Sequence, residues 1–361
     1  MSHKKKIVVS VSSDLSTDQR VQKICDTLER NNFEVLLLGR KLSDSPKYLN
    51  KSYVSKRFNL WFNRSALFYA NLNIRLFFKL LFTKLDVLYA NDLDVLPANY
   101  LASKIKGVPL IYDSHEYFTE VPELVNRPSV QQIWKRIERA IVPKLTHCIT
   151  VTTQIAETYT KLYGVDFKVM RNFPVHIEHQ ISEKENVILY QGALNVGRGL
   201  EELITAMPGV SSELWIAGGG DIEQELKTFV NDSGLNGKVK FLGRLEPLEL
   251  NGYTLKAKIG VSLEHKLGLN YTYALPNKIF DYLLCQTPVL YADLVEVKKL
   301  LNGKQVGEEL KSYKPEILAK QLNEMLNSTN YKTWQLNCEK LSKKLTWQEE
   351  EKVLLTMLQE F

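Results

Sequence analysis

Short apolar runs alternate with amphipathic stretches along the whole chain. Runs of four to eight apolar residues are typical of buried parallel strands, and apolar residues spaced three and four apart predict helices between them. In the first half the predicted strands cover residues 5–12, 33–38, 86–90, 108–112, 147–153 and 168–170. In the second half they cover residues 187–190, 213–217, 239–242, 257–263 and 289–292. This alternation predicts an α/β fold.

A polar stretch at residues 175–186 separates two series of strands and helices. A chain of 361 residues is also too long for one ordinary hydrophobic core. We therefore predict two Rossmann-like domains that face each other across a cleft, with the boundary between residues 176 and 177.

The stretch from Arg57 to Leu85 is rich in leucine and aromatic residues, and it contains no acidic residue. Its basic residues are Arg57, Arg64, Arg75, Lys79 and Lys84. A basic amphipathic helix of this kind can lie in a membrane interface. Alternatively, one or two helices pack on the sheet and their cations point outward, which is the interpretation that we favour.

The overall composition excludes some classes of protein and some partners. The chain has no apolar run long enough to span a bilayer, no signal-peptide pattern, and four scattered cysteines that are typical of a reducing cytoplasm. Residues 1–180 contain 26 Lys and Arg against 17 Asp and Glu, which predicts a negatively charged partner for this half. Only residues 57–84 combine basic and aromatic residues, and those aromatics fit a core better than a nucleic-acid groove. We expect a cytoplasmic protein, with residues 57–84 as the candidate contact with the inner membrane face.

Two polar clusters follow predicted strands in the first half, where parallel sheets bind ligands. One is Asn91 to Asp94 and the other is Asp113 to Glu116, which contains His115. A histidine at this position can act as an acid, a base or a hydrogen-bond partner. The Asp92-Leu93-Asp94 pattern has the form of a metal site, but loop solvation or helix capping is the interpretation that we favour, so no metal is predicted.

Glycine-rich turns follow two predicted strands of the second half. Gly192 to Gly199 contains Arg198, whose guanidinium can bind a diphosphate through two hydrogen bonds. Gly218 to Gly220 can bring backbone N–H groups close to a phosphate, although such glycines also serve tight turns.

The stretch from Tyr271 to Ala292 predicts a loop, a helix that begins near Pro276, whose fixed φ suits a first helical turn, and a strand. Lys278, near the N-terminus of this helix, would attract phosphate. Asp281, one turn later, would accept hydrogen bonds from sugar hydroxyls. The alternative is an ordinary crossover helix with a solvated lysine and aspartate.

Together these motifs resemble the retaining, two-domain (GT-B) glycosyltransferases of family 4, the group 1 glycosyltransferases. The second half carries the most specific pieces: Gly192 with Arg198-Gly199 after it, IAGGG, FLGR and PNKIFDYLLCQTPVL. In the first half, His115 resembles the active-site histidine of the family and Arg171-Asn172 resembles the end of its first domain. The resemblance covers nearly the whole chain.

The resemblance implies transfer of a hexose from a nucleotide diphosphate sugar, linked to UDP or GDP, to a hydroxyl of a glycan or lipid-linked saccharide. It implies retention at the anomeric carbon, no metal and no cofactor. Residues 1–176 would bind the acceptor, residues 177–340 would bind the donor, and the helix in residues 341–361 would return to the first domain. His115 would be the catalytic residue. The donor site would comprise Gly192, Arg198, Gly199, Gly218, Gly219, Pro276, Asn277, Lys278 and Asp281. The acceptor side would comprise Asp14, Asn91, Asp92, Glu116, Asn172 and Tyr273.

Two positions depart from the pattern of the family. Tyr273 stands where the first acid of the paired glutamate motif is expected, and Ala193 stands where an arginine often follows the glycine. Arg198 and Lys278, together with the N-terminus of the helix at Pro276, are therefore expected to stabilise the diphosphate. A sugar-nucleotide epimerase on the same fold and a degenerate nucleotide-binding scaffold of a polysaccharide-assembly complex remain the alternatives.

Overall fold

A computed structural model describes residues 4–16, 18–42, 51–63, 65–177 and 183–361. The chain forms two compact units. The first unit contains Met1–Asn172 and Glu350–Phe361, and the second contains Phe173–Glu349. In the ranges described, no helix combines the length and the apolar character that crossing a bilayer requires.

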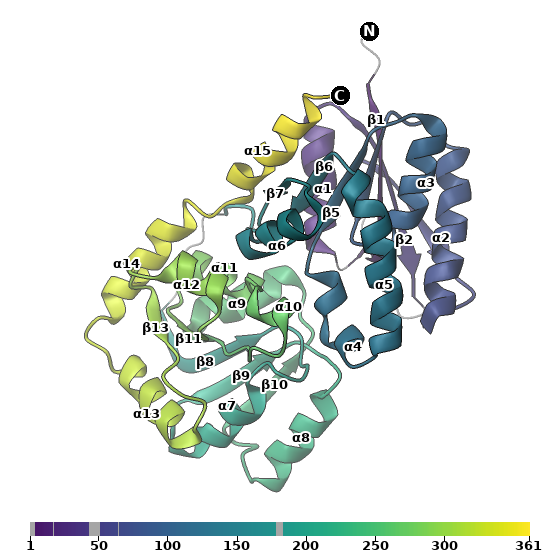
Figure 1. Ribbon diagram of the computed structural model, residues 1–361. Coiled ribbons are helices and arrows are strands. Elements are labelled where there is room, and N and C mark those ends of the chain that lie inside the picture. The colour runs from purple at the N-terminus through teal and green to yellow at the C-terminus, as the bar shows by residue number, and fades with distance from the viewer. Residues whose placement is uncertain (1–3, 17, 43–50, 64, 178–182) are drawn as a thin grey trace. The chain divides into compact units, whose positions relative to one another are not determined.

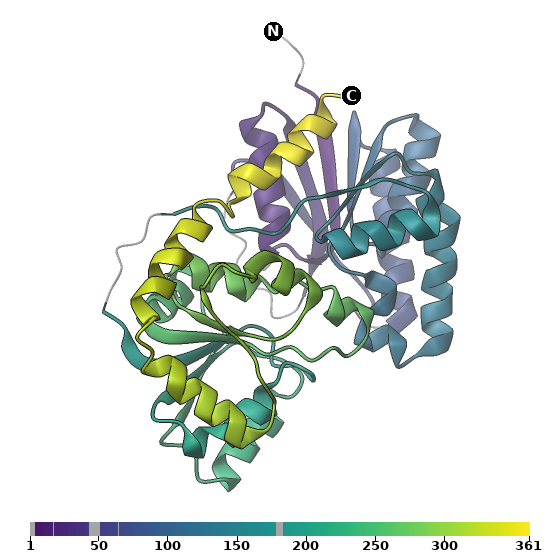
Figure 2. The same ribbon diagram turned by 60° about the vertical axis from the view of Figure 1, so that its left-hand side comes forward.

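The first unit is built on a seven-stranded parallel sheet with the strand order β3-β2-β1-β4-β5-β6-β7. Its strands are β1 (Lys6–Asp14), β2 (Glu34–Lys41), β3 (Val54–Asn59), β4 (Val87–Asn91), β5 (Leu110–Ser114), β6 (His147–Thr150) and β7 (Phe167–Val169). Its main helices are α1 (Gln19–Arg30), α2 (Ser65–Leu81), α3 (Leu96–Lys106), α4 (Pro122–Val125), α5 (Pro128–Ile141) and α6 (Thr153–Tyr163). Helices α2, α3 and α5 lie on one face of this sheet and α1 lies on the other (Figure 2).

The second unit contains a six-stranded parallel sheet with the order β10-β9-β8-β11-β12-β13 (Figure 1). Its strands are β8 (Glu185–Gln191), β9 (Glu213–Ala217), β10 (Val239–Gly243), β11 (Ala257–Ser262), β12 (Val289–Tyr291) and β13 (Gly307–Glu309). Its helices are α7 (Leu200–Ala206), α8 (Glu223–Asp232), α9 (Pro247–Lys256), α10 (Leu269–Thr272), α11 (Asn277–Leu284), α12 (Val295–Leu301), α13 (Pro315–Leu326) and α14 (Tyr331–Ser342). The last helix, α15 (Trp347–Leu358), runs from the second unit into the first.

The central strands are buried on both faces, as their continuous apolar runs predict. On β8, Ile188 and Tyr190 belong to one hydrophobic core of the second unit, while Val187 and Leu189 belong to another. Successive side chains of a strand point to opposite faces, so the two cores lie on the two sides of the sheet. The two cores therefore enclose β8 from both sides.

The helix predicted to begin near Pro276 is confirmed, because α11 begins at Asn277 and Pro276, with an extended ψ of 126°, is the residue before it. One local prediction is wrong. Residues 57–59, expected in a helix, belong to β3, which pairs with β2 at the edge of the sheet. All four cysteines are buried and free.

Candidate functional site

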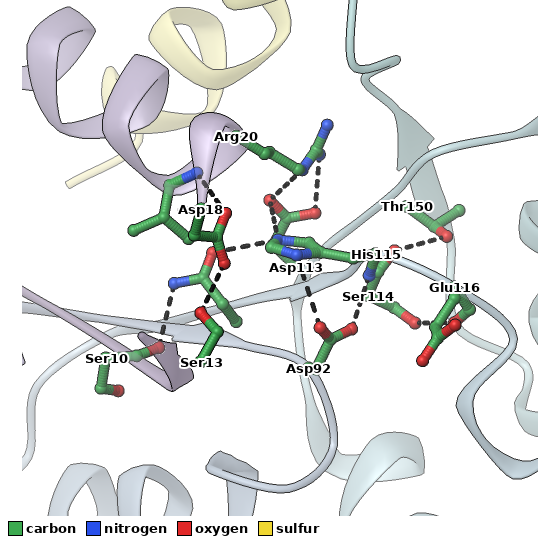
Figure 3. A network of polar contacts seen from close by, with 12 residues as sticks. Ser10, Ser13, Asp18, Arg20, Asp92, Asp113, Ser114, His115, Glu116 and Thr150 are labelled. Carbon is green, nitrogen blue, oxygen red and sulfur yellow. Dashed lines mark hydrogen bonds and ion pairs between the residues drawn. The ribbon is translucent and has the colours of Figure 1, made fainter. Parts of the chain in front are cut away.

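The polar cluster of the first unit lies where β4 and β5 end side by side. The register of these strands pairs Asn91 with Asp113. Asp92, the next residue, adopts a left-handed φ of 67°, which is uncommon for a residue other than glycine. Its backbone N–H donates to the Asp113 carbonyl over 2.8 Å. This turn points the Asp92 carboxylate at His115 (Figure 3).

Oxygen atoms surround both ring nitrogens of His115. Its Nδ1 lies 3.4 Å from Asp92 Oδ2, and its Nε2 lies 3.4 Å from Asp113 Oδ2. The Nε2 atom is also 3.1 Å from Asn91 Oδ1, and the Asn91 amide nitrogen donates to the Ser10 carbonyl over 3.0 Å. Because these neighbours accept hydrogen bonds, both ring nitrogens act as donors.

The electrostatics agree with a charged ring. Burial by itself would lower the pKa of His115, but the carboxylates of Asp92 and Asp113 outweigh burial and raise this pKa to about 9. At neutral pH the ring is therefore an imidazolium with no free lone pair. It can donate hydrogen bonds and stabilise negative charge, but it is not poised to act as a base.

Asp113 is held by a buried arginine that sequence reasoning missed. Arg20 Nη2 donates to Asp113 Oδ1 over 2.8 Å, and Arg20 Nε donates to Asp113 Oδ2 over 3.1 Å. Tyr89 donates its hydroxyl to the same Oδ2 over 2.8 Å. Burial would raise the pKa of Asp113, but Arg20 and His115 hold it far below its usual range. The sequence could have indicated that Arg20 is buried, because Arg20 precedes Ile24 by one helical turn on the apolar face of α1.

The other residues expected on the acceptor side have separate surroundings. Asp14 Oδ1 accepts hydrogen bonds from the backbone and hydroxyl of Ser16 and lies 3.7 Å from Arg57 Nη1. The Asn172 carbonyl accepts a hydrogen bond from Lys23 Nζ over 3.3 Å. Glu116 follows His115, and its carbonyl accepts a hydrogen bond from the Ser114 hydroxyl. The structure thus brings Asn91 and Asp92 to His115, and gives Asp14 and Asn172 partners of their own.

Asp92 and Asp94 do not share an environment. Asp92 faces His115, whereas burial, reinforced by the charge of Asp92, raises the pKa of Asp94 to about 7. Within the described ranges, no group of three or more His, Cys, Asp and Glu side chains is arranged to hold a metal ion.

Glycines bring two turns of the second unit into close contact. Gly218 has a φ of 144°, and a Cβ atom there would lie 1.9 Å from the Gly192 carbonyl oxygen. Gly199 has a φ of 70°, and a Cβ atom there would lie 2.4 Å from the Leu263 carbonyl oxygen. No L-residue with a side chain fits either position without moving the backbone. The turns after β8 and β9 therefore pack directly on each other.

Two cations of the second unit share one buried carboxylate. Lys278 Nζ lies 2.8 Å from Glu264 Oε1, and Arg198 Nη1 lies 3.6 Å from the same oxygen. Glu264 Oε2 accepts a hydrogen bond from the Ser262 hydroxyl over 2.7 Å. Burial would raise the pKa of Glu264, but Lys278 and Arg198 outweigh it and lower this pKa. The group keeps an excess of one positive charge.

Aromatic rings fix both cations. Lys278 Nζ lies 3.9 Å from the centroid of the Tyr190 ring, and Arg198 Cζ lies 4.8 Å from the centroid of the Tyr271 ring. Lys278 is only 8% exposed, so the alternative of a solvated lysine is wrong. Glu264 is a site residue that sequence reasoning missed. It follows the apolar run 257–263, so its place at a strand end could have indicated it.

Asp281 lies one turn into α11, where Gln191 Nε2 donates to its Oδ2 over 2.8 Å. The Gln191 amide oxygen in turn accepts a hydrogen bond from the Thr254 hydroxyl over 2.9 Å. Gln191 ends β8, so this bond anchors α11 to the strand that leads into Gly192. Tyr273 is the residue just after α10, and it is half-buried on the loop that leads to α11.

Comparison with known proteins covers both halves of the chain. Residues 18–173 match the family model described as Glycosyltransferase Family 4, and residues 174–346 match the model described as Glycosyl transferases group 1. An uncharacterized glycosyltransferase of Methanocaldococcus jannaschii is 38% identical over 80 residues. That match covers 21% of this chain and 19% of the relative.

Solved structures of low sequence identity share the fold. A sucrose-phosphate synthase from Thermosynechococcus elongatus aligns over 99% of both chains, with a TM-score of 0.79 and 15% identity. The Anabaena protein HepE, in complex with UDP and glucose, aligns over 99% of this chain and 100% of its own, with a TM-score of 0.73 and 16% identity. The GT-B architecture predicted from the sequence is confirmed.

Proposed function

Because this chain belongs to the group 1 glycosyltransferases of family 4, we propose that it transfers a hexose from a nucleotide diphosphate sugar to an acceptor hydroxyl with retention. The observation that carries this proposal is the arrangement of Lys278 and Arg198 around Glu264. One carboxylate holds two cations in fixed positions, and it neutralises only one of them. A diphosphate can supply the missing negative charge.

The donor is assigned to the second unit. Gly192, Gly218 and Gly219 lie in the turns after β8 and β9, where the two backbones come into direct contact. Lys278 lies beside Gly192. The N-terminus of α11, with Asn277 exposed, adds its helix dipole to the two cations. Asp281, whose Oδ2 accepts a hydrogen bond from Gln191, would accept hydrogen bonds from the ribose hydroxyls. The complex of HepE with UDP and glucose favours a UDP-linked donor, and a GDP-linked donor is the alternative.

In the proposed reaction the sugar leaves the diphosphate, and negative charge grows on the leaving phosphate. Arg198, Lys278 and the α11 N-terminus are already in position before the reaction begins. They can therefore stabilise the growing charge without reorganising. The proposal includes no metal and no cofactor. Departure and attack occur on the same face of the sugar, which gives retention without an enzymic nucleophile.

His115 is proposed to contact the donor sugar or the acceptor as a charged hydrogen-bond donor, with Asn91 and Asp92 beside it. The acceptor is a hydroxyl of a glycan or a lipid-linked saccharide in this proposal. We place the reaction in the cytoplasm, with a peripheral contact at the inner membrane face through residues 57–84.

The test is isothermal titration of the full chain with UDP and with GDP, each with and without Mg²⁺. We expect one nucleotide to bind without Mg²⁺, and Arg198→Ala to weaken its binding about tenfold or more. Lys320→Ala, an exposed lysine of the same unit, is the matched control. If neither UDP nor GDP bound, the enzyme assignment would be overturned. If Arg198→Ala bound the nucleotide as tightly as the unchanged chain, Arg198 would not belong to the site.

Two alternatives are separated by the products. An epimerase would convert the sugar nucleotide without any acceptor, whereas a transferase requires one. A nucleotide-binding scaffold would bind the donor and convert nothing, and Tyr273 in place of the usual acid keeps this alternative open. Mass spectrometry of donor incubations with and without saccharide acceptors distinguishes the three.

A further inference from the structure

Helix α2 has apolar residues on two opposite faces. Phe68, Leu72, Leu76 and Leu80 are buried against the first unit. A second row of apolar residues faces outward. It consists of Leu67, Ile74 and Phe78 in the helix and of Phe82 just after the helix end, and these side chains are 54%, 58%, 52% and 81% exposed. A helix that only packs on a sheet needs one apolar face. The outward row runs about 22 Å along the helix, so it needs an explanation of its own.

Helix α3 widens this outward row. Asn73 of α2 donates to the Asp94 carbonyl and accepts from the Ala98 backbone N–H, and Lys106 Nζ donates to the Leu81 carbonyl over 3.0 Å. Residue 73 is therefore level with residue 98, and residue 81 with residue 106. By this offset the exposed side chains of α3, Leu101 and Ile105, lie level with residues 76 and 80 of α2, within the length that the row from Ile74 to Phe82 covers.

The charges on these two helices all have one sign. Residues 65–81 and 96–106 contain Arg75, Lys79, Lys104 and Lys106 and no acidic residue. Trp61 precedes α2 and is 78% exposed, and its ring lies 4.6 Å from the Arg75 guanidinium carbon. An exposed tryptophan beside an arginine is a combination that suits the boundary between headgroups and acyl chains.

We propose that the exposed side chains of α2 and α3, together with Trp61, form a surface that docks on an anionic lipid bilayer. The apolar row enters the acyl boundary, and the four cations contact the lipid phosphates. A second copy of the chain fits poorly, because a two-fold interface would bring the same four cations against one another. This surface extends the candidate membrane contact from residues 57–84 to α3. Its binding to a bilayer does not depend on the transferase reaction.

The first experiment is co-sedimentation of the full chain with vesicles of phosphatidylcholine alone and with about 30% phosphatidylglycerol. We expect binding to the anionic vesicles only, weakened strongly when salt is raised from roughly 0.1 M to 1 M. Lys79→Gln with Lys104→Gln should weaken binding on the order of 20-fold, since each cation near an anionic surface contributes about fivefold. Phe78→Ser with Phe82→Ser should weaken it about tenfold or more.

The second experiment uses the tryptophans. Trp61 is exposed, whereas Trp134, Trp215, Trp334 and Trp347 are buried, so lipids brominated in their acyl chains should quench Trp61 alone. Trp61→Phe should remove the quenchable fraction of the fluorescence. Leu248→Ser, which changes a residue of the second unit that is 84% exposed, is the matched control and should leave both readouts unchanged.

Each contrary result has a defined meaning. Equal binding to neutral and anionic vesicles would overturn the role of the cations. Absence of binding to both would overturn the membrane assignment. Sedimentation velocity that shows a dimer, dissociated by Phe78→Ser with Phe82→Ser, would replace the bilayer with a second copy. Circular dichroism melting of each variant ensures that a loss of binding is not a loss of fold.

Discussion

Each of the two units has a buried group of charged side chains at the ends of its strands, and the two groups differ in net charge. In the first unit, Asp92 and Asp113 face Arg20 and His115, so two negative and two positive charges offset each other. In the second unit, Glu264 faces both Lys278 and Arg198, which leaves one positive charge in excess.

This difference separates two tasks. The balanced group fixes one side chain in one protonation state, because both nitrogens of His115 are engaged. The group with excess positive charge is suited to bind an anion. A neutral polyol is a suitable ligand for the first group and a diphosphate for the second. The following predictions test this contrast, from the largest expected effect to the smallest.

Removal of Arg20 should have the largest effect on stability. Arg20→Met leaves the buried, charged Asp113 with the His115 imidazolium and the Tyr89 hydroxyl but without its closest cation, and the first unit should lose about 3–5 kcal/mol of unfolding free energy. Denaturant unfolding measures this loss, with the exposed Arg136→Met as the control. Nucleotide affinity of the second unit should be unchanged where the variant is folded. A parallel loss of nucleotide affinity would show that the contrast between the units is wrong.

Removal of Lys278 should affect both binding and stability of the second unit. Lys278→Met leaves the buried Glu264 carboxylate with Arg198 alone, at a cost of about 3 kcal/mol, and should weaken nucleotide diphosphate binding about 100-fold. Adding Glu264→Gln removes the uncompensated charge, so stability should recover while binding stays weak. If the double variant binds normally, Lys278 only neutralises Glu264.

The raised pKa of His115 makes the first unit sensitive to alkaline pH. Because the folded pKa is about 9 and the unfolded pKa is about 6.5, the imidazolium stabilises the fold fully below pH 6.5, and this contribution disappears as pH rises to 9. The unfolding free energy should fall by up to about 3 kcal/mol across this interval. Denaturant titrations at several pH values measure it, and His115→Gln should flatten the slope. An equal slope in that variant would assign the dependence to other groups.

The smallest effect is expected for a substitution that keeps the positive charge at position 198 but replaces the planar guanidinium group. Arg198→Lys loses the planar fork and the contact with the Tyr271 ring, so nucleotide affinity should fall about fivefold. Titration calorimetry measures the change. A loss as large as that of Arg198→Ala would mean that geometry alone decides binding, and no loss would mean that any cation suffices.

Much of the fold and part of the site could be predicted from local patterns. The apolar runs located the strands of both sheets except β3 and β13. The helical spacing of Ile279, Phe280, Leu283 and Leu284 predicted the apolar face of α11, and all four are buried. His115 was found because strand ends carry ligand sites in parallel sheets, and its contacts with Asn91 and Asp92 follow from the pairing of β4 and β5.

The partners of these residues required the tertiary structure. Arg20 meets Asp113 across 93 positions of sequence, and Lys278 and Arg198 come to Glu264 from different loops. No periodicity encodes such pairs, because the order and register of the strands decide them.

By itself, the sequence of residues 57–85 determined a strongly apolar, basic segment, and it left open whether that segment packs on the sheet or lies on a membrane. The structure shows that α2 packs through one face and exposes another apolar face. Apolar spacing specifies where a helix forms and how its faces differ. Which face the sheet covers depends on the neighbouring strands and helices, and those contacts exist only once the chain has folded.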